Sequence, residues 1–371
     1  MTRKSILLSA AAALLLIPAV AFPALTDAKN PSPESSQGGL RQFEMQTRLF
    51  DGTPVEITIA ASSSDEARAR AAISAAANRA EAFYRGVLAE GNAQDQLNAL
   101  PPGKPIELSP DAFALLSKAI DIAAVTGGWY DPAAPSPKGR FTQRDWRRIR
   151  LNADSRTATF RSDDMKLDLR PVSLGFAADL AMESLESQGF TNARVGVGPV
   201  CRIAGRDIFT PWKLQVGFGA NSEAAGTQEA SKFAHRAFDY NVTNVAASTV
   251  TAEGLGSGLV DPKNKKPVEA KKMKSVTVMA ADATTAAAYS LAAWTLGPRI
   301  GMRFIEAHPE VKGVLVDSEG QLFASEGLGV AGAQPAASAE AEGTGEPSRP
   351  IARDMGPADL KQKKAEEERE M

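Results

Sequence analysis

Side chains suited to nucleophilic or metal chemistry are scarce in this sequence. There is one cysteine, Cys201, and there are two histidines, His235 and His308. A single thiol can form neither an intrachain disulfide nor a thiolate cage, and no serine stands in a nucleophile elbow. His308 precedes Pro309 at a predicted helix end, where a capping or surface role is expected. His235 lies within a predicted strand, next to Arg236, and its side chain could be either hydrogen-bonded in the interior or exposed. Most zinc hydrolases, haem proteins and disulfide scaffolds are therefore excluded.

Glycine-rich segments could bind phosphate through their backbone N–H groups. No P-loop pattern is present. The run Gly254–Gly258 (GLGSG) neither follows a strand nor opens a helix, as a dinucleotide-binding fold would require. Two interpretations stay open for this run: a mobile loop, or a set of free N–H groups near a phosphate. The pair Gly196 and Gly198 is better explained by close packing between strands.

The overall charge is nearly balanced. The 371 residues include 42 Lys and Arg against 44 Asp and Glu, which gives a formal net charge of −2. Such a balance leaves no basic surface for nucleic acid, which is therefore not an expected partner. Hydrophobic residues make up 43% of the chain, enough for the core of one large domain or two closely packed ones.

The two ends of the chain differ in composition from the middle. Residues 1–21 combine Arg3 and Lys4 with a short apolar run and the small residues Ala19 and Ala21, which is typical of a cleaved secretory signal peptide. A retained membrane anchor is the competing interpretation, although Pro18 and the short run favour cleavage. We expect a Pro/Ser/Gly linker at 22–41, one domain at 42–328 and a solvated, charged tail at 329–371. The expected location is the periplasm, with no membrane anchor after cleavage.

The middle of the chain mixes predicted strands and helices without a regular βαβ rhythm, so the expected class is α+β, with mixed sheets and packed helices. Asp51-Gly52 predicts a hairpin over 43–60, and Ser63 with Glu66 predicts a capping box that opens a helix to about Leu88. Leu97-Asn98 is expected in a loop. Further helices are predicted from Ser109-Pro110 to Gly127 and at 175–188, 284–296 and 300–307. Further strands are predicted at 149–151, 157–160, 165–169, 193–197, 200–204, 214–218, 233–245, 275–280, 314–316 and 321–324.

Several segments between 43 and 325 follow one known order of motifs. They are Phe43–Thr47 (FEMQT), Leu97-Asn98, Thr126–Pro132 (TGGWYDP), Leu167–Asp179 (LDLRPVSLGFAAD), Val195–Val200 (VGVGPV), Leu259–Val268 (LVDPKNKKPV) and the strand–helix unit Ser275–Gly297. Together they resemble the ApbE family, the FAD:protein FMN transferases. The motifs of that family are Met-Gly-Thr, Leu-Asn, T-x-G-x-F-D-P, L-D-L-G-G-I-A-K-G-Y-A-x-D, a strand that ends in Gly-Gly-Asp, and H-I-x-D-P-x-T-G-x-P-V. Single segments are weak signals, but the ordered set is specific.

The resemblance implies an ApbE-like fold and a chemistry. Family members bind FAD and Mg²⁺, break the FAD pyrophosphate and esterify FMN to a Thr or Ser of an acceptor protein. It also implies FAD as the cofactor and a flavin acceptor or another cell-envelope protein as the partner. Asp168 corresponds to a nucleotide contact, although a structural role at a strand end is the alternative. The full set of implied flavin-site residues is Met45, Trp129, Tyr130, Asp131, Asp168 and Val260.

The sequence departs from the family pattern at the positions that hold the metal. The Asp and the Thr or Ser of the last helix are Ala287 and Leu291 here, and neither side chain offers an oxygen. The main-chain carbonyl ligand falls at Pro171, which keeps its C=O. Other polar family positions have become Leu174, Val200 and Gly258. These substitutions argue against Mg²⁺, which requires hard oxygen ligands.

Three carboxylates near the lost ligands are the only replacements that the sequence suggests. Asp282 is expected as a helix N-cap and Asp261 in an Asx turn, while Glu253 lies near both. The main hypothesis is an exported ApbE-like protein that keeps a flavin pocket and has lost or weakened its transfer activity. One alternative is an active, Mg²⁺-dependent transferase with a rearranged site, and another is an interaction module of the envelope without a ligand.

Overall fold

The computed structural model describes residues 39–135, 145–161, 164–217, 237–252, 254–255, 259–268 and 273–329. The predicted signal peptide, most of the predicted linker and nearly all of the predicted tail lie outside these ranges, as do His235, Glu253 and Gly258. Within the described ranges, no helix is both long enough and apolar enough to cross a membrane.

One antiparallel sheet of eight strands organises the chain. Its strand order is β1-β2-β6-β7-β10-β11-β12-β13, and every neighbouring pair is antiparallel. The α+β class expected from the sequence is confirmed. The strands are β1 (Leu40–Arg48), β2 (Pro54–Ser62), β6 (Ala193–Val197), β7 (Val200–Ala204), β10 (Val245–Thr251), β11 (Met273–Ala280), β12 (Lys312–Asp317) and β13 (Leu322–Ala324).

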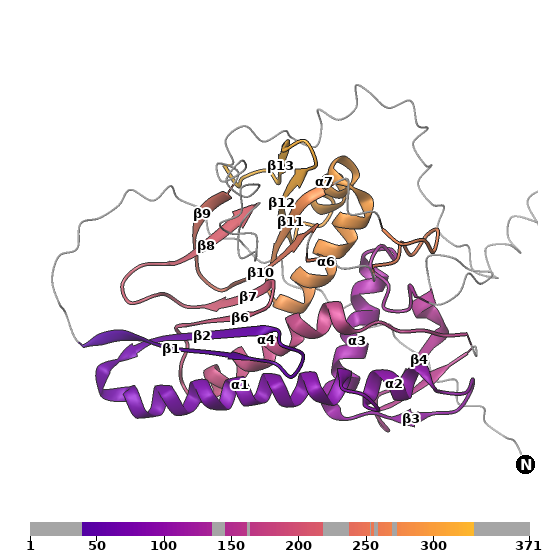
Figure 1. Ribbon diagram of the computed structural model, residues 1–371, viewed down its shortest axis with the longest axis horizontal. Helices are drawn as coiled ribbons and strands as arrows, with labels where there is room; N and C mark the ends of the chain where they lie inside the picture. The colour runs from indigo at the N-terminus through magenta and orange to yellow at the C-terminus, as the bar shows by residue number, and fades with distance from the viewer. Residues whose placement is uncertain are drawn as a thin grey trace, which may run out of the picture. The chain divides into compact units, whose positions relative to one another are not determined.

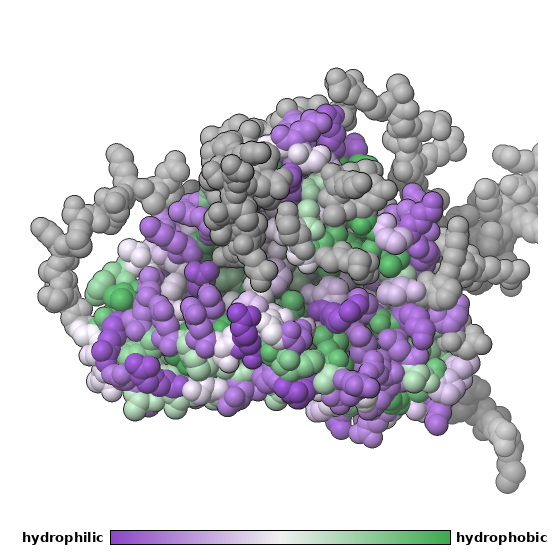
Figure 2. Space-filling view, in the orientation of Figure 1, coloured by the Kyte–Doolittle hydropathy of each residue, from purple (hydrophilic) through white to green (hydrophobic). Residues whose placement is uncertain are grey.

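Four helices cover one face of this sheet (Figure 1). They are α1 (Glu66–Leu88), α4 (Arg170–Ser187), α6 (Ala283–Leu296) and α7 (Pro298–Glu306). The main hydrophobic core lies between them and the strands, and alanines make up much of the buried stripe of α1. Along the lower edge of Figure 2, where α1 runs, hydrophilic residues are interspersed with hydrophobic ones.

The other face of the sheet is covered by a two-stranded ribbon, β8 (Trp212–Gly217) and β9 (Ala237–Val242), which encloses a second core. Strands β10 and β11 are consequently buried along almost their whole length. The sequence patterns did not predict β10. Its residues, VAASTVT, do not alternate between polar and apolar side chains. A strand that is covered on both faces has no solvent-facing side and therefore needs no such alternation.

A smaller group of elements stands beside the main sheet. It contains the three-stranded sheet β3-β5-β4, the helices α2 and α3, and a short 3₁₀ helix at Asp145–Arg148. The bounds are α2 (Ala93–Asn98), β3 (Ile106–Glu107), α3 (Pro110–Val125), β4 (Ile149–Asn152) and β5 (Thr157–Phe160).

Two expectations were wrong in this region, for one reason. Leu97-Asn98 belongs to α2 and not to a loop, and 165–169 is not a strand. The amide of Asn98 exchanges two hydrogen bonds with the backbone of Leu167, at 2.7 and 3.1 Å, and Gln94 Oε1 accepts from Leu169 N at 2.7 Å. Side chains of α2 thus take the place of a neighbouring strand, which periodicity cannot reveal.

The helix starts confirm some predicted caps and correct others. Ser109 caps α3 by accepting from Ala112 N at 3.2 Å, and His308 Nδ1 lies 2.7 Å from Phe304 O at the end of α7, as a capping role requires. The capping box at Ser63 does not form, because residues 63–65 make a 3₁₀ turn capped by Ser62. Helix α4 begins at Arg170, five residues earlier than predicted, because Pro171 suits the first turn of a helix.

Helices α4 and α6 approach each other closely at Gly175. A Cβ atom at this position would lie 2.5 Å from the Ala283 carbonyl oxygen and 2.7 Å from Thr284 Cα, both backbone atoms that cannot yield easily. We expect Gly175→Ala to lower the free energy of unfolding by about 2 kcal/mol, because the two helices must separate. Urea denaturation measures this effect.

Gly86 provides the matched control, because it also lies in a helix and a Cβ there would meet no atom within 4 Å. We expect Gly86→Ala to raise the free energy of unfolding by about 0.5–1 kcal/mol, through helix propensity and a smaller loss of backbone entropy. Equal effects of the two substitutions would contradict the close approach of α4 and α6.

Candidate functional site

Three segments that are distant in sequence meet beside α3. They are Trp129–Ala134, the stretch around Asp168, and the loop Leu259–Val268; together they are called the candidate site below. Asp168 N donates to Pro132 O at 2.9 Å, and Lys265 Nζ donates to Ala134 O at 3.1 Å. The Lys263 amine lies 6.0 Å from the centroid of the Trp129 ring. The fold therefore brings together the segments that carry five of the six residues implied by the family resemblance. Val260 is included because its loop contacts the segment Trp129–Ala134, and Met45 is the residue left out.

The chain enters the site through a sharp turn after α3. Gly127 and Gly128 adopt φ angles of 64° and 86°, a left-handed conformation that glycine tolerates at little cost. The turn leaves Trp129 half-buried and buries Tyr130. Burial raises the pKa of Tyr130, and the nearby carboxylates of Asp168 and Asp131 raise it further. The Tyr130 hydroxyl is buried and has no hydrogen-bond partner among the described residues.

A second buried donor without a partner lies next to this turn. Trp146 Nε1 has no acceptor among the described residues, although the backbone N–H of Trp146 donates to Asp131 Oδ2 at 3.3 Å. Buried polar groups are normally satisfied by protein, water or a ligand. Among the described residues, this region therefore holds two buried donors without an acceptor.

Asp131 shapes the turn with both of its carboxylate oxygens. Besides Trp146 N, it accepts from Ala133 N at 2.8 Å. Burial raises the pKa of Asp131 to about 6; hydrogen bonds from the two backbone amides oppose this rise, Asp145 adds to it and Lys265 opposes it. Since both oxygens already bond to the backbone of the chain, the main role visible for Asp131 is to hold this turn in shape.

Asp168 is similarly occupied, by Arg170. Its Oδ1 accepts from Arg170 N at 3.1 Å and from Arg170 Nε at 2.9 Å, and its Oδ2 accepts from Arg170 Nη2 at 3.0 Å. The carboxylate thereby accepts from the first backbone N–H of α4. This is a structural contact but not the strand-end role given as the alternative, because 165–169 is not a strand. Met45 lies half-buried on β1, opposite Ile57, and none of the described contacts joins it to the candidate site.

The side chains of Ala287 and Leu291, which the family resemblance aligns with metal ligands, do not fit Mg²⁺. Ala287 is 2% exposed and Leu291 is half-buried on α6. The hydroxyl between them, Ser290 Oγ, donates to Ala287 O at 2.8 Å and lies 3.1 Å from Ser248 Oγ. Among the described residues, no group of three or more His, Cys, Asp and Glu could hold a metal ion. Mg²⁺ requires near-octahedral oxygen ligation, which methyl and isobutyl groups cannot supply.

Two other altered positions, Leu174 and Val200, are apolar and packed. Leu174 reaches the β6–β7 turn, where its Cδ1 would lie 3.7 Å from a Cβ atom at Gly198. Gly198 itself has φ 56°, a conformation that favours glycine in this turn. A Cβ atom there would also lie 3.1 Å from Thr53 Cγ2, so close packing contributes as well. A Cβ atom at Gly196 would lie no closer than 3.8 Å to any neighbouring atom, so close packing does not require glycine there. Val200 is 2% exposed at the start of β7.

The two described carboxylates that could have replaced the lost ligands have other partners. Asp261 forms the Asx turn expected from the sequence and accepts from Lys263 N at 2.7 Å. Asp282 forms the expected N-cap of α6, with Thr285 N donating to it at 2.8 Å, and it pairs with Lys118 Nζ at 2.8 Å. Burial alone would raise the pKa of Asp282, but Lys118 and the capping hydrogen bonds together lower it.

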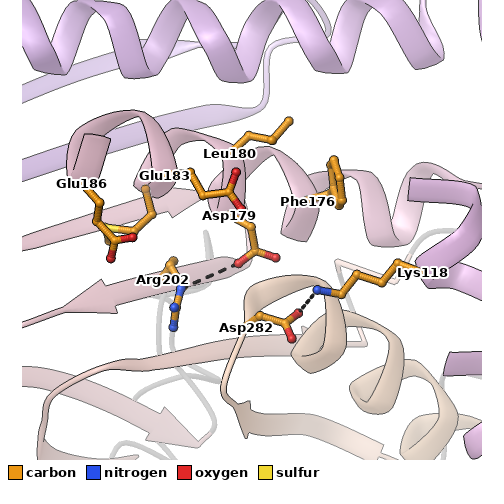
Figure 3. A pocket seen from close by; sticks show the side chains of 9 residues that line it. Lys118, Phe176, Asp179, Leu180, Glu183, Glu186, Arg202 and Asp282 are labelled. Carbon is orange, nitrogen blue, oxygen red and sulfur yellow. Dashed lines mark ion pairs between the residues drawn. The ribbon is translucent and has the colours of Figure 1, made fainter. Parts of the chain in front are cut away.

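Asp282 lines a small hollow between α3, α4, α6 and β7. Dashed lines in Figure 3 mark two ion pairs in this hollow, Lys118 with Asp282 and Arg202 with Asp179. Asp179 of α4 lies beside Asp282 and 3.8 Å from Arg202 Nε. Burial raises the pKa of Asp179, and the charge of Asp282 raises it further. The other lining residues are Phe176, Leu180, Met182, Glu183 and Glu186. In this hollow the carboxylate of Asp179 joins α4 to the first turn of α6.

Similar proteins share this fold. A protein from Thermotoga maritima described as ApbE is 19% identical, covers 77% of this chain and 97% of its own length, and superposes with a TM-score of 0.61. The flavinyl transferase ApbE of Pseudomonas stutzeri is 15% identical over 78% of this chain and 96% of its own, with a TM-score of 0.63. The flavin transferase ApbE of Vibrio cholerae is 16% identical over 78% and 98%, with a TM-score of 0.58.

A comparison with curated protein sequences finds no match. The sequence model of the ApbE family, in contrast, matches residues 52–315, which is well over half of the chain. The matched region runs from the β1–β2 turn to β12 and includes all three segments of the candidate site. The chain therefore belongs to the ApbE family.

Proposed function

We propose that this chain is an exported ApbE-family protein that binds a flavin nucleotide at the candidate site and has lost Mg²⁺-dependent FMN transfer. The observation that carries the proposal is the pair Ala287 and Leu291 on α6, where the family motif has two oxygen ligands. Asp282 and Asp261, the two described carboxylates that the sequence suggested as replacement ligands, are held by other partners.

The expected loss follows from the chemistry of a pyrophosphate. Its charge is dense, and a metal ion normally neutralises that charge while a hydroxyl attacks in line and the leaving phosphate departs. Side chains without oxygen atoms cannot hold the ion. Binding of a flavin does not have the same requirement, because an aromatic face and a few polar groups are sufficient.

Features of the candidate site support binding. The half-buried Trp129 offers a ring for stacking, and the exposed Lys263 beside it offers a positive charge for a phosphate. Neither the hydroxyl of Tyr130 nor Trp146 Nε1 has a hydrogen-bond partner in the described part of the chain, and a polar ligand can supply one.

Flavin titration tests this function directly. Purified full-length protein is titrated with FMN and with FAD, once with EDTA and once with millimolar Mg²⁺, and flavin fluorescence reports binding. We expect saturable binding with the same Kd in both buffers, weakened about tenfold or more by Trp129→Ala because stacking is lost. Phe209→Ala is the control, since Phe209 is an aromatic residue that is 62% exposed and belongs to no part of the candidate site.

Co-expression with an acceptor of a flavin transferase tests the loss of activity. We expect no covalent FMN fluorescence on the acceptor in a denaturing gel. Labelling that depends on Mg²⁺ would overturn the proposal and establish an active enzyme with a rearranged site. No binding of either flavin would instead favour an interaction module of the cell envelope without a ligand. Cell fractionation tests export, with the mature chain expected in the periplasm.

A further inference from the structure

The loop Leu259–Val268 is closed on itself by its backbone. Val268 N donates to Leu259 O, and Asp261 N donates to Lys266 O, both at 2.9 Å. Val260 and Pro267 form an isolated antiparallel bridge. Lys265 N completes the turn by donating to Asp261 O at 2.9 Å. The loop is therefore a compact unit whose place on the protein depends on its contacts outside itself.

Lys265 has an unusual backbone conformation within this loop. Its φ angle is 62°, in the left-handed region that favours glycine. Among the described residues other than glycine, only Arg156 and Asn244 also have a positive φ. The motif H-I-x-D-P-x-T-G-x-P-V, which this segment resembles, has glycine at the corresponding place. A lysine in this conformation persists when its surroundings hold it there.

The side chain of Lys265 shows what holds it. Its ammonium group donates to Ala134 O at 3.1 Å and forms an ion pair with Asp145. The Lys265 side chain is 8% exposed and that of Asp145 is 1% exposed. Arg148 Nη1 also pairs with Asp145 at 3.2 Å. A buried ion pair whose other hydrogen bonds are satisfied fixes the relative position of its two partners. The loss of one partner leaves the other as an uncompensated buried charge.

This buried contact joins two parts of the candidate site. Ala134 ends the segment that begins with Trp129, and Asp145 precedes Trp146, whose backbone bonds to Asp131. On the loop side, Lys263 lies two residues before Lys265 and places its amine near the Trp129 ring. The Trp129 ring and the Lys263 amine come from different segments. Among the described contacts, only the Lys265 ammonium forms a hydrogen bond between these two segments.

We propose that Lys265 is a positioning residue of the flavin site, whose buried ammonium fastens the loop Leu259–Val268 to Ala134 and Asp145 and so sets Lys263 beside Trp129. This inference rests on the proposed flavin binding. Lys265 itself does not touch the flavin; it acts by keeping the two sides of the site at a fixed separation, which spares the ligand the cost of ordering the loop.

Hydrogen exchange and flavin titration on the full-length chain test this role. Lys265→Met keeps the aliphatic stem and removes the charge, whereas Lys265→Gly also relieves the left-handed backbone. Lys266→Met is the control, since its side chain is exposed on the same loop. We expect amide exchange over 259–268 to rise about tenfold or more in both Lys265 variants, with exchange in β1 and β2 unchanged. We expect the FMN Kd to rise about tenfold in the same variants and to stay constant in Lys266→Met.

A double variant tests whether the ammonium acts through Asp145. Because the two groups share one contact, Lys265→Met with Asp145→Asn should weaken flavin binding no more than the stronger single substitution. Unchanged loop exchange in Lys265→Gly and Lys265→Met overturns the fastening role, and a loosened loop with an unchanged Kd overturns the positioning role. If the unaltered protein binds no flavin, the proposed function fails, while the exchange experiment still decides whether Lys265 fastens the loop.

Discussion

Ala287→Asp combined with Leu291→Thr is expected to make the stability of the protein depend on Mg²⁺. Ala287 is 2% exposed, so a carboxylate there has no solvent to compensate its charge. In EDTA we expect the free energy of unfolding to fall by about 3–5 kcal/mol, the range observed for uncompensated buried charges. Millimolar Mg²⁺ should recover part of this loss, because an ion bound only by the folded state stabilises it by mass action. Urea unfolding with and without Mg²⁺ measures both effects.

Ala286→Asp is the matched control for this variant. Ala286 is also buried on α6, but its side chain points about 100° away from that of Ala287 around the helix axis. We expect a similar loss of stability with no recovery in Mg²⁺. An equal Mg²⁺ effect in the control or in the unaltered protein would contradict the assignment of Ala287 and Leu291 to the lost metal positions. Covalent FMN transfer by the double variant would show that these two substitutions carried the loss of activity.

The elements that the sequence predicted well are those with strong local signals. Asp51-Gly52 turns the β1–β2 hairpin, Ser109-Pro110 opens α3, and Asp282 caps α6. The signals that failed depend on distant partners. Strand β10 is buried on both faces and therefore lacks alternation, and Asn98 satisfies the backbone of Leu167 from 69 residues away.

The candidate site was predictable only in part, for the same reason. The aromatic and acidic motif at 129–131 and the loop at 259–268 are visible as separate motifs, and only the fold joins them. Lys265 and Asp145 are 120 residues apart, and a lysine in a polar loop normally indicates a solvated side chain. The one local signal for Lys265 was that it stands where the family motif has glycine. That signal identifies neither its left-handed backbone nor its buried partner Asp145.

The junction of α4 and α6 depends on one carboxylate, and its removal should be costly. Asp179 accepts from Ala283 N at 2.8 Å, from Thr284 N at 3.0 Å and from Thr284 Oγ1 at 2.7 Å. The two amides belong to the first turn of α6, where the helix itself supplies no acceptor. Asp179→Ala leaves three donors without a partner in a buried place, so we expect the free energy of unfolding to fall by about 4 kcal/mol, even though repulsion from Asp282 is relieved.

Urea denaturation at pH 7 measures this loss, with Glu186→Ala as the matched control. Glu186 lies on the same helix and lines the same hollow, but it is exposed, and its removal should change the free energy of unfolding by less than about 0.5 kcal/mol. Asp179→Asn keeps one acceptor oxygen and removes the charge, so its loss should be smaller than that of Asp179→Ala. If Asp179→Ala costs no more than Glu186→Ala, the carboxylate does not hold α6 against α4, and the contact between the two helices depends on apolar packing, including the close approach at Gly175.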